Sequence, residues 1–263
     1  FLGMRISSQR LRKISVGLLV ASIVGLALVF VPGLGVTVNG ATRWIKFPGF
    51  GRFQPSELAK LGLVLYLAAY LTVKGRDIRD LKRGFLPALI PLLPIGALVM
   101  KEPDMGTTIV LMLTGLAMVG VAGARKRHIA AVLAFGLLAG SILIMTSNYR
   151  KERVMSFRNP FKDYYGSGYQ VSQSLIALGS GGLFGVGLCE SREKLFYLPA
   201  EHTDFIFAVL GEEAGLIGTL FIAGLFLFFG ARGFSVACGA NESFSRLVAA
   251  GLSVMISGQA LLN

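Results

Sequence analysis

The clearest structural signal in the sequence is Tyr197-Leu-Pro-Ala-Glu-His-Thr-Asp-Phe-Ile-Phe207. Its polar run, Glu201-His-Thr-Asp204, directly precedes a long apolar segment that begins at Phe205. Asp204 is therefore expected at or just inside a membrane boundary, where an ionisable group is by default a functional-site hypothesis. The alternative is that Asp204 and Thr203 cap the helix that follows, since both residue types are favoured at N-caps.

The composition extends this interpretation to the whole chain. Of its 263 residues, 54% are hydrophobic, and the mean hydropathy is +0.67, which indicates a polytopic helical membrane protein. The net charge of +12 does not indicate a nucleic-acid-binding protein, because the basic residues lie in short loops and form no continuous face. The chain begins without Met and stops inside an apolar stretch, so we expect both ends to be cuts in a longer protein.

Seven apolar windows, separated by charged loops, predict an all-α bundle. They cover residues 14–31, 58–73, 85–100, 107–122, 129–145, 205–230 and 247–263. Three prolines are expected to kink the third window. We predict a single transmembrane domain over residues 1–263, incomplete at both ends, with a large loop at 146–204.

Alternation of these windows assigns the loops to two sides. Basic residues with few acids fill one set of loops, at 5–13, 74–83, 125–127 and 232–246. The positive-inside rule places that set in the cytoplasm. The loops at 32–55, 101–104 and 146–204 then face outward and carry both acids and bases close to the apolar windows. Solvated ion pairs explain some of these charges, but a cluster at one membrane face suits an anionic lipid head group.

Two outward motifs begin predicted helices. In Phe53-Gln-Pro-Ser-Glu-Leu-Ala-Lys60, a helix starts near Pro55, and Glu57 and Lys60 are three residues apart. They either form a local ion pair or both face one cavity. A charged side chain inside a membrane-spanning helix is energetically costly. In Lys101-Glu-Pro-Asp-Met-Gly-Thr-Thr108, Asp104 is expected to cap the next helix, whereas Glu102 is free to line a cavity.

The loop at 146–204 contains a third motif. Tyr169 to Leu178 is predicted to be an amphipathic helix, with Gln170, Gln173 and Ser174 on one face and Val171, Leu175 and Leu178 on another. The glycine-rich run 179–187 then predicts a flexible backbone that approaches its neighbours closely. A re-entrant or surface-lying segment fits this stretch better than a full span.

Several kinds of site are excluded. The sequence has no His/Cys cluster for a metal, no Ser-His-Asp arrangement and no P-loop. Among the outward candidates for proton abstraction, Asp204 has the best-defined setting.

Together, the motifs resemble the SEDS family, which includes FtsW, RodA and SpoVE. The matching stretches are Asn39-Gly-Ala-Thr-Arg-Trp-Ile45, Gln54-Pro-Ser-Glu-Leu-Ala-Lys60, Glu102-Pro-Asp-Met-Gly-Thr107, Gly168-Tyr-Gln170, Ser180-Gly-Gly182 and Leu198-Pro-Ala-Glu-His-Thr-Asp-Phe-Ile-Phe207. They occur in family order over almost the whole chain. The insert Ser191-Arg-Glu-Lys194 looks more like the FtsW/SpoVE branch than RodA.

The resemblance implies a peptidoglycan glycosyltransferase that polymerises lipid II at the outer face of the bacterial cytoplasmic membrane, during division or sporulation. Family members have about ten helices and work with a class B penicillin-binding protein and other divisome proteins. The family's essential Asp falls on Asp204, the expected general base. The expected substrate-binding residues are Arg43, Trp44, Arg52, Gln54, Ser56, Glu57, Lys60, Glu102, Asp104, Tyr169, Gln170, Gln173, Ser174, Lys194, His202 and Thr203.

Three points stay open at this level. The residues identify no definite cofactor: Glu57 and Glu102 either position Lys60 or Arg43 or coordinate a divalent cation, Mg²⁺ or Mn²⁺. A lipid II flippase and a noncatalytic division scaffold are the rival functions. Division, sporulation and elongation are not distinguished.

Overall fold

The computed structural model describes residues 6–38, 41–47, 51–146, 151, 160–163, 168–187, 190 and 206–262. The chain divides into two compact units. The first unit contains residues 1–130 and 229–262, and the second contains residues 131–228. Helices dominate the described residues, which confirms the predicted helical membrane fold.

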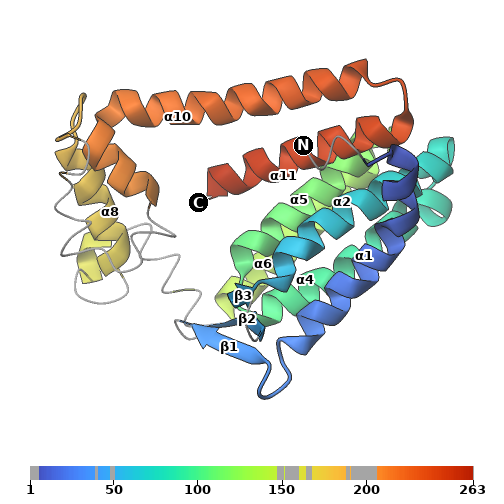
Figure 1. Ribbon diagram of the computed structural model, residues 1–263, viewed down its shortest axis with the longest axis horizontal. Coiled ribbons are helices and arrows are strands. Elements are labelled where there is room, and N and C mark those ends of the chain that lie inside the picture. Colours follow the sequence, from blue (N-terminus) through green and yellow to red (C-terminus); the bar gives the residue numbers. More distant parts are fainter. Residues whose placement is uncertain are drawn as a thin grey trace. The chain divides into compact units, whose positions relative to one another are not determined.

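Five helices form the body of the first unit. They are α1 (Ser8–Leu28), α2 (Pro55–Lys74), α4 (Leu92–Lys101), α5 (Met105–Val121) and α11 (Ser243–Leu262). Helix α2 is central, because α1, α5 and α11 all pack against it (Figure 1). Its side chains Leu63, Val64 and Leu67 are fully buried. This packing buries the apolar middle of α2 and also Ser56 and Lys60 near its start, whereas Glu57 in the first turn stays exposed.

The third predicted window is broken into short pieces. After η2 (Gly75–Arg79) come a π-helical turn η3 (Leu81–Phe85) and α3 (Leu86–Leu89), before α4 begins. The break between α3 and α4 falls at Ile90–Pro91, since proline lacks the N–H that an uninterrupted helix needs. The helix is thus interrupted at one of the three prolines, while Ile90 and Pro91 keep right-handed helical dihedral angles; a bend of the helix axis there stays a prediction.

A small antiparallel sheet forms within residues 32–54, for which the sequence predicted only a polar loop. Its strands are β1 (Gly35–Val38), β2 (Ala41–Phe47) and β3 (Gly51–Phe53), in the order β1-β2-β3. Ile45 faces Phe53 in the β2–β3 register and is buried. The strands are only three to seven residues long, too short for a clear alternating pattern.

The second unit contains most of α6 (Lys126–Met145), η4 (Pro160–Asp163), α8 (Tyr169–Ser180) and the first part of α10 (Ile206–Gly239). The segment after α8 runs against α10, because the amide of Val186 donates to Glu212 and that of Leu216 to Gly182. Gly185 has a φ of +83°, and a Cβ atom there would collide with the main-chain carbonyl of Glu213. This confirms the predicted close approach of the glycine-rich run.

Each of the seven apolar windows overlaps a helix. Among the described residues, six helical segments are long and apolar enough to cross a membrane, and α5 is a shorter apolar helix. No residue is buried in the most apolar window of α6, whereas 61% of the window in 55–79 is buried. Helices that are apolar on every exposed face are typical of proteins in contact with lipid.

The loops of the first unit lie at two ends, as alternation predicts. The last turns of α2 and α5 and the first turn of α11 line one cavity, so the loops at 74–83, 121–127 and 239–246 share one end. The other end holds strand β2, the loop between α4 and α5, and the start of α2. Which end faces the cytoplasm stays a prediction from charge.

Candidate functional site

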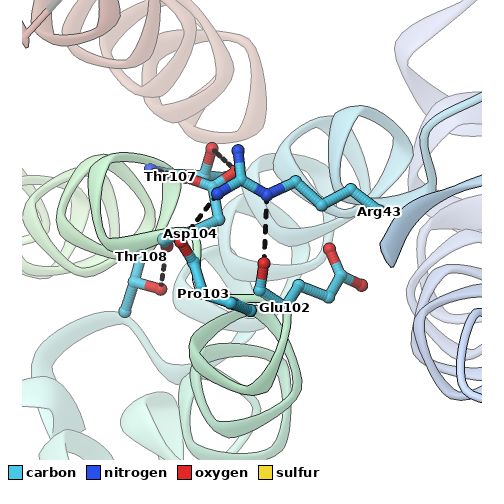
Figure 2. A network of polar contacts seen from close by, with 6 residues as sticks. All are labelled: Arg43, Glu102, Pro103, Asp104, Thr107 and Thr108. Carbon is cyan, nitrogen blue, oxygen red and sulfur yellow. Dashed lines mark hydrogen bonds and ion pairs between the residues drawn. The ribbon is translucent and has the colours of Figure 1, made fainter. Parts of the chain in front are cut away.

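Arg43 joins the sheet to the loop between α4 and α5. Its Nε donates to the main-chain carbonyl of Glu102 at 3.0 Å, and its Nη2 donates to that of Pro103 at 2.7 Å (Figure 2). Its Nη1 lies 3.8 Å from a carboxylate oxygen of Asp104. Three contacts made by one planar guanidinium group fix its orientation, which a lysine ammonium could not match. The positive charge of Arg43 is thus held at a defined place.

Asp104 caps α5. One carboxylate oxygen accepts from the amide of Thr107 at 3.1 Å, and the other accepts from the Thr107 hydroxyl at 2.9 Å. The hydroxyl of Thr108 donates to the Asp104 carbonyl at 2.8 Å (Figure 2). The predicted N-cap is confirmed. Because the cap also brings a carboxylate towards Arg43, it couples the start of α5 to strand β2.

Glu102 is the most unusual acid in the first unit. Its side chain is fully buried, and within the described part of the chain neither carboxylate oxygen has a hydrogen-bond partner. Burial, with a smaller contribution from the negative charge of Asp104, raises its pKa from 4.5 to about 8, although Arg43 opposes the shift. The raised pKa favours the protonated form of Glu102 at neutral pH. Arg43 is positioned by the main-chain carbonyl of Glu102, while the Glu102 side chain extends away from the guanidinium group (Figure 2).

This setting predicts a specific pH dependence of stability. The folded chain binds the Glu102 proton more tightly than the unfolded chain, whose pKa is near 4.5. The stabilisation is therefore fully present below about pH 4.5 and is lost as the pH rises through about 8. Glu102→Gln should flatten that loss, seen as a smaller fall in melting temperature between about pH 5 and about pH 9, with about 2–4 °C for each kcal/mol. Glu190→Gln, at an exposed acid, is the control, and an equal flattening there would contradict the assignment.

Lys60 is a buried cation with two partners. Only 3% of its side chain is exposed, although Lys60 lies within the first two turns of a predicted span. Its Nζ pairs with the Glu57 carboxylate at 2.9 Å and donates to Oε1 of Gln259 on α11. The sequence left open a local pair or a cavity-facing pair. The structure shows the Glu57–Lys60 pair and adds Gln259, which sequence reasoning missed.

Gln259 could have been found from one signal. It is a polar side chain within the last apolar window, 247–263, where a polar group needs a partner inside the protein. Nothing in the sequence states that this partner is Lys60, 199 residues away. The contact depends on α11 packing against α2.

The remaining candidates of the first unit are less tightly held. Ser56 is fully buried, and within the described residues its hydroxyl has no hydrogen-bond partner. Trp44 on β2 and Gln54, just before α2, are half-buried, and Arg52 on β3 is exposed. Pro55 occupies the first turn of α2, as predicted. Ser56 thus resembles Glu102 in being a buried polar group without a hydrogen-bond partner among the described residues.

The second unit holds the α8 candidates, which differ in burial. Gln173 is 4% exposed, while Gln170 is exposed and Tyr169 is half-buried. Ser174 donates to the Val171 carbonyl of its own helix at 2.8 Å. The predicted apolar face is not the buried one, because Leu175 and Leu178 are exposed. Such an arrangement suits a membrane protein, in which apolar faces contact lipid and polar faces turn inward.

Four candidates, Asp204, Lys194, His202 and Thr203, lie outside the described residues. A shared cleft between Asp204, Arg43 and Lys60 therefore stays a prediction. Within the described residues, no group of three or more His, Cys, Asp or Glu side chains could hold a metal ion.

Comparison with known proteins identifies relatives over the whole chain. A family model for FtsW, RodA and SpoVE, described as "Cell cycle protein", matches residues 1–263. The chain is 40% identical over 263 residues to a probable peptidoglycan glycosyltransferase FtsW of Geobacter sulfurreducens, covering 99% of this chain and 69% of that protein. It is 43% identical over 238 residues to stage V sporulation protein E of Bacillus subtilis, covering 90% of this chain and 65% of that protein.

Solved structures agree with this assignment. One, described as "Structural coordination of polymerization and crosslinking by a peptidoglycan synthase complex", matches with a TM-score of 0.75 and 31% identity, over 97% of this chain and 70% of the matched one. The rod shape determining protein RodA of Thermus thermophilus matches with a TM-score of 0.64 and 32% identity, over 95% of this chain and 64% of that one.

Proposed function

Because the chain belongs to the FtsW/RodA/SpoVE family of multi-pass membrane proteins, we propose that it is a peptidoglycan glycosyltransferase. Its substrate is lipid II, which it joins into glycan strands at the outer face of the cytoplasmic membrane during division or sporulation. The observation that carries this proposal is that Arg43 and Lys60 are held in place by contacts from separate elements, β2 with the α4–α5 loop and α2 with α11. Both stand at the end of the first unit that charge patterning assigns to the outside.

The proposed reaction joins two lipid-linked sugars. The C4 hydroxyl of one sugar attacks C1 of the second, a C–O bond forms, and the bond to undecaprenyl pyrophosphate breaks. Asp204 takes the proton of the attacking hydroxyl as general base. The leaving pyrophosphate carries away the electron pair, and fixed cations stabilise its developing charge. We assign that role to Arg43 and Lys60, with Arg52 and Lys194 as further contributors.

The acids near these cations have separate tasks. Glu57 pairs with Lys60 and so sets where the ammonium group lies. Asp104 holds the start of α5 and lies beside Arg43. Glu102, whose raised pKa favours its neutral form, adds little negative charge to a place where a pyrophosphate must approach. Lys60 and Arg43 therefore each have one carboxylate nearby, Glu57 and Asp104, rather than several acids that would repel the substrate.

We infer that these acids position neighbouring groups rather than hold a resident metal ion. Asp104 is engaged by Thr107 and Arg43, and burial raises the pKa of Glu102. A requirement for Mg²⁺ or Mn²⁺ with the pyrophosphate substrate stays a proposal, and the proposed reaction uses no metal ion. Polymerisation measured with and without a chelator tests it.

We further propose a class B penicillin-binding protein as the partner, together with other divisome proteins. The solved synthase complex that resembles this chain couples polymerization with crosslinking, which supports a transpeptidase partner. Polymerisation by purified protein, with lipid II presented on the accessible side, tests the function with and without that partner. Glycan synthesis supports the enzyme, whereas transport of lipid II without synthesis supports the flippase.

Arg43→Lys tests the cation at the β2 strand. The variant keeps the charge but cannot make the forked contacts to Glu102 and Pro103. We expect kcat/KM to fall about tenfold, since one or two lost hydrogen bonds of about 0.5–1.5 kcal/mol each misplace the charge. Steady-state kinetics with lipid II measure this. Lys46→Arg, at an exposed basic residue of the same sheet to which the scheme gives no role, is the control, and an equal loss in both would contradict a special role for Arg43.

A further inference from the structure

A cavity of about 460 Å³ lies in the first unit, at the end away from Arg43 and Lys60. It is formed where the last turns of α2 and α5 meet the first turn of α11, and η2 completes its wall. About four turns of α2, roughly 22 Å, separate Lys60 from Gly75 at the edge of this cavity. The cavity is therefore distinct from the proposed polymerisation site.

Three guanidinium groups line the cavity. Arg76 and Arg79 come from η2, and Arg246 comes from the first turn of α11. Among the described residues, no carboxylate forms an ion pair with any of the three. Asp77 and Glu242, the nearest acids in sequence, are not part of the lining. Three positive charges thus gather in one concave place whose lining contains no carboxylate.

Further features of the cavity favour a phosphate group. Ser243 lies at the N-terminus of α11, a helix of 20 residues, and its dipole adds positive potential at the mouth. Thr72 adds a hydroxyl to the lining. Arg246 donates to the Ala240 carbonyl at 3.2 Å, so one guanidinium group is already oriented. Arginine forks match phosphate oxygens in both charge and geometry.

The apolar part of the wall indicates where the phosphate comes from. Leu71, Ile78, Val121 and Leu247 lie beside the arginines in the same cavity. Val73 on the last turn of α2 is 68% exposed, and Val121 is 41% exposed, on helices that are apolar enough to contact lipid. A ligand with a phosphate and acyl chains fits both parts of this surface. Basic pockets between transmembrane helices on the cytoplasmic side are typical binding places for such head groups.

We propose that this cavity binds the phosphate of an anionic phospholipid of the inner leaflet. The lipid's phosphate contacts Arg76, Arg79 and Arg246, and its acyl chains lie along the apolar wall. The site holds three helix ends together, so an anionic lipid joins α2, α5 and α11 at the end of the first unit remote from the polymerisation site.

The test is a binding measurement on purified protein in phosphatidylcholine nanodiscs. The exposed Cys238, two residues before the carbonyl that Arg246 contacts, carries a fluorescent donor, with Cys189→Ser removing the other thiol. Acyl-labelled phosphatidylglycerol serves as the acceptor. We expect saturable energy transfer, competed by unlabelled phosphatidylglycerol and not by phosphatidylcholine.

The variant R76Q/R79Q/R246Q is expected to weaken this binding about a hundredfold, since each basic residue near an anionic lipid contributes about a factor of five. The control K82Q/K126Q/R127Q removes three charges from the same end, at residues that do not line the cavity. It should change binding less than threefold. Equal weakening by both variants overturns the proposal, because it means general surface attraction. Melting temperatures of the two variants establish that both are folded.

Two further arms identify the source of the phosphate. Inorganic pyrophosphate competes weakly if the apolar wall contributes, and this supports a lipid ligand. Pyrophosphate competition as strong as that of phosphatidylglycerol still supports a phosphate site but assigns it to a soluble compound. If an acidic peptide displaces the donor signal and phosphatidylglycerol does not bind, the cavity is a protein-docking surface and the proposal is wrong.

Discussion

Polymerisation by the Asp204→Asn variant is expected to fall by about 10²–10⁴-fold, because the amide cannot accept the proton of the attacking hydroxyl. The change keeps the shape of the side chain and removes only its basicity. Glycan chain formation from lipid II by purified, reconstituted protein measures the loss. The effect should appear in kcat more than in KM, since the base acts in the transition state.

The matched control is Asp163→Asn, an acid in the same predicted outward loop. It should retain activity within about threefold, as expected for a side chain outside the reaction. Both variants should insert and melt like the parent chain. Full polymer synthesis by Asp204→Asn would remove the general base from the scheme. Loss of lipid II transport in that variant, with no synthesis by the parent, would favour the flippase instead.

Gln259→Leu is expected to lower kcat about ten- to a hundredfold, although Gln259 itself touches no reacting atom in the scheme. The variant removes an acceptor from the buried ammonium group of Lys60 and leaves Glu57 as its partner. A displacement of a charged group by about 1 Å costs up to about 10²-fold in rate. The unsatisfied donor should also cost about 1–3 kcal/mol in the free energy of unfolding. Gln259 is thus a positioning residue for Lys60.

Gln259→Glu separates this role from a purely structural one. Glutamate keeps an acceptor oxygen at the same place, so it should restore most of the activity. Lys60→Met is expected to raise KM as well as lower kcat, because it removes the charge that attracts the pyrophosphate. If Gln259→Leu melts at a lower temperature but polymerises at the parent rate, the contact serves stability only.

Much of the fold was predictable from local patterns. Long apolar windows fix helices in a membrane because no water is present to satisfy an open backbone, so each window overlaps an observed helix. Asp104 caps α5, and the proline-rich third window breaks, because both effects act within one turn of helix. The resemblance of the motifs to one family also agreed with the comparisons.

Other features could not be predicted from the sequence and became visible only in the tertiary structure. The sheet of residues 35–53 depends on pairing between strands too short to give a pattern. For α8, periodicity identified two faces but did not say whether lipid or protein covers each, and the structure shows that Leu175 and Leu178 are exposed. The sequence also did not show how Glu102 is used. Its main-chain carbonyl holds Arg43, while its side chain is buried and has a raised pKa.

The sequence by itself determined the helical spans, their alternation and the residues that carry charge at each end. Those properties follow from hydrophobicity and from short-range capping, which act between neighbours in the chain. Only the tertiary structure decided that Lys60 meets Gln259 across 199 residues, that Arg43 is fixed by the α4–α5 loop, and that three arginines share one cavity. Partners of this kind are set by which helix faces pack together, and hydrophobic packing between helices is not specified by the order of residues within any one of them.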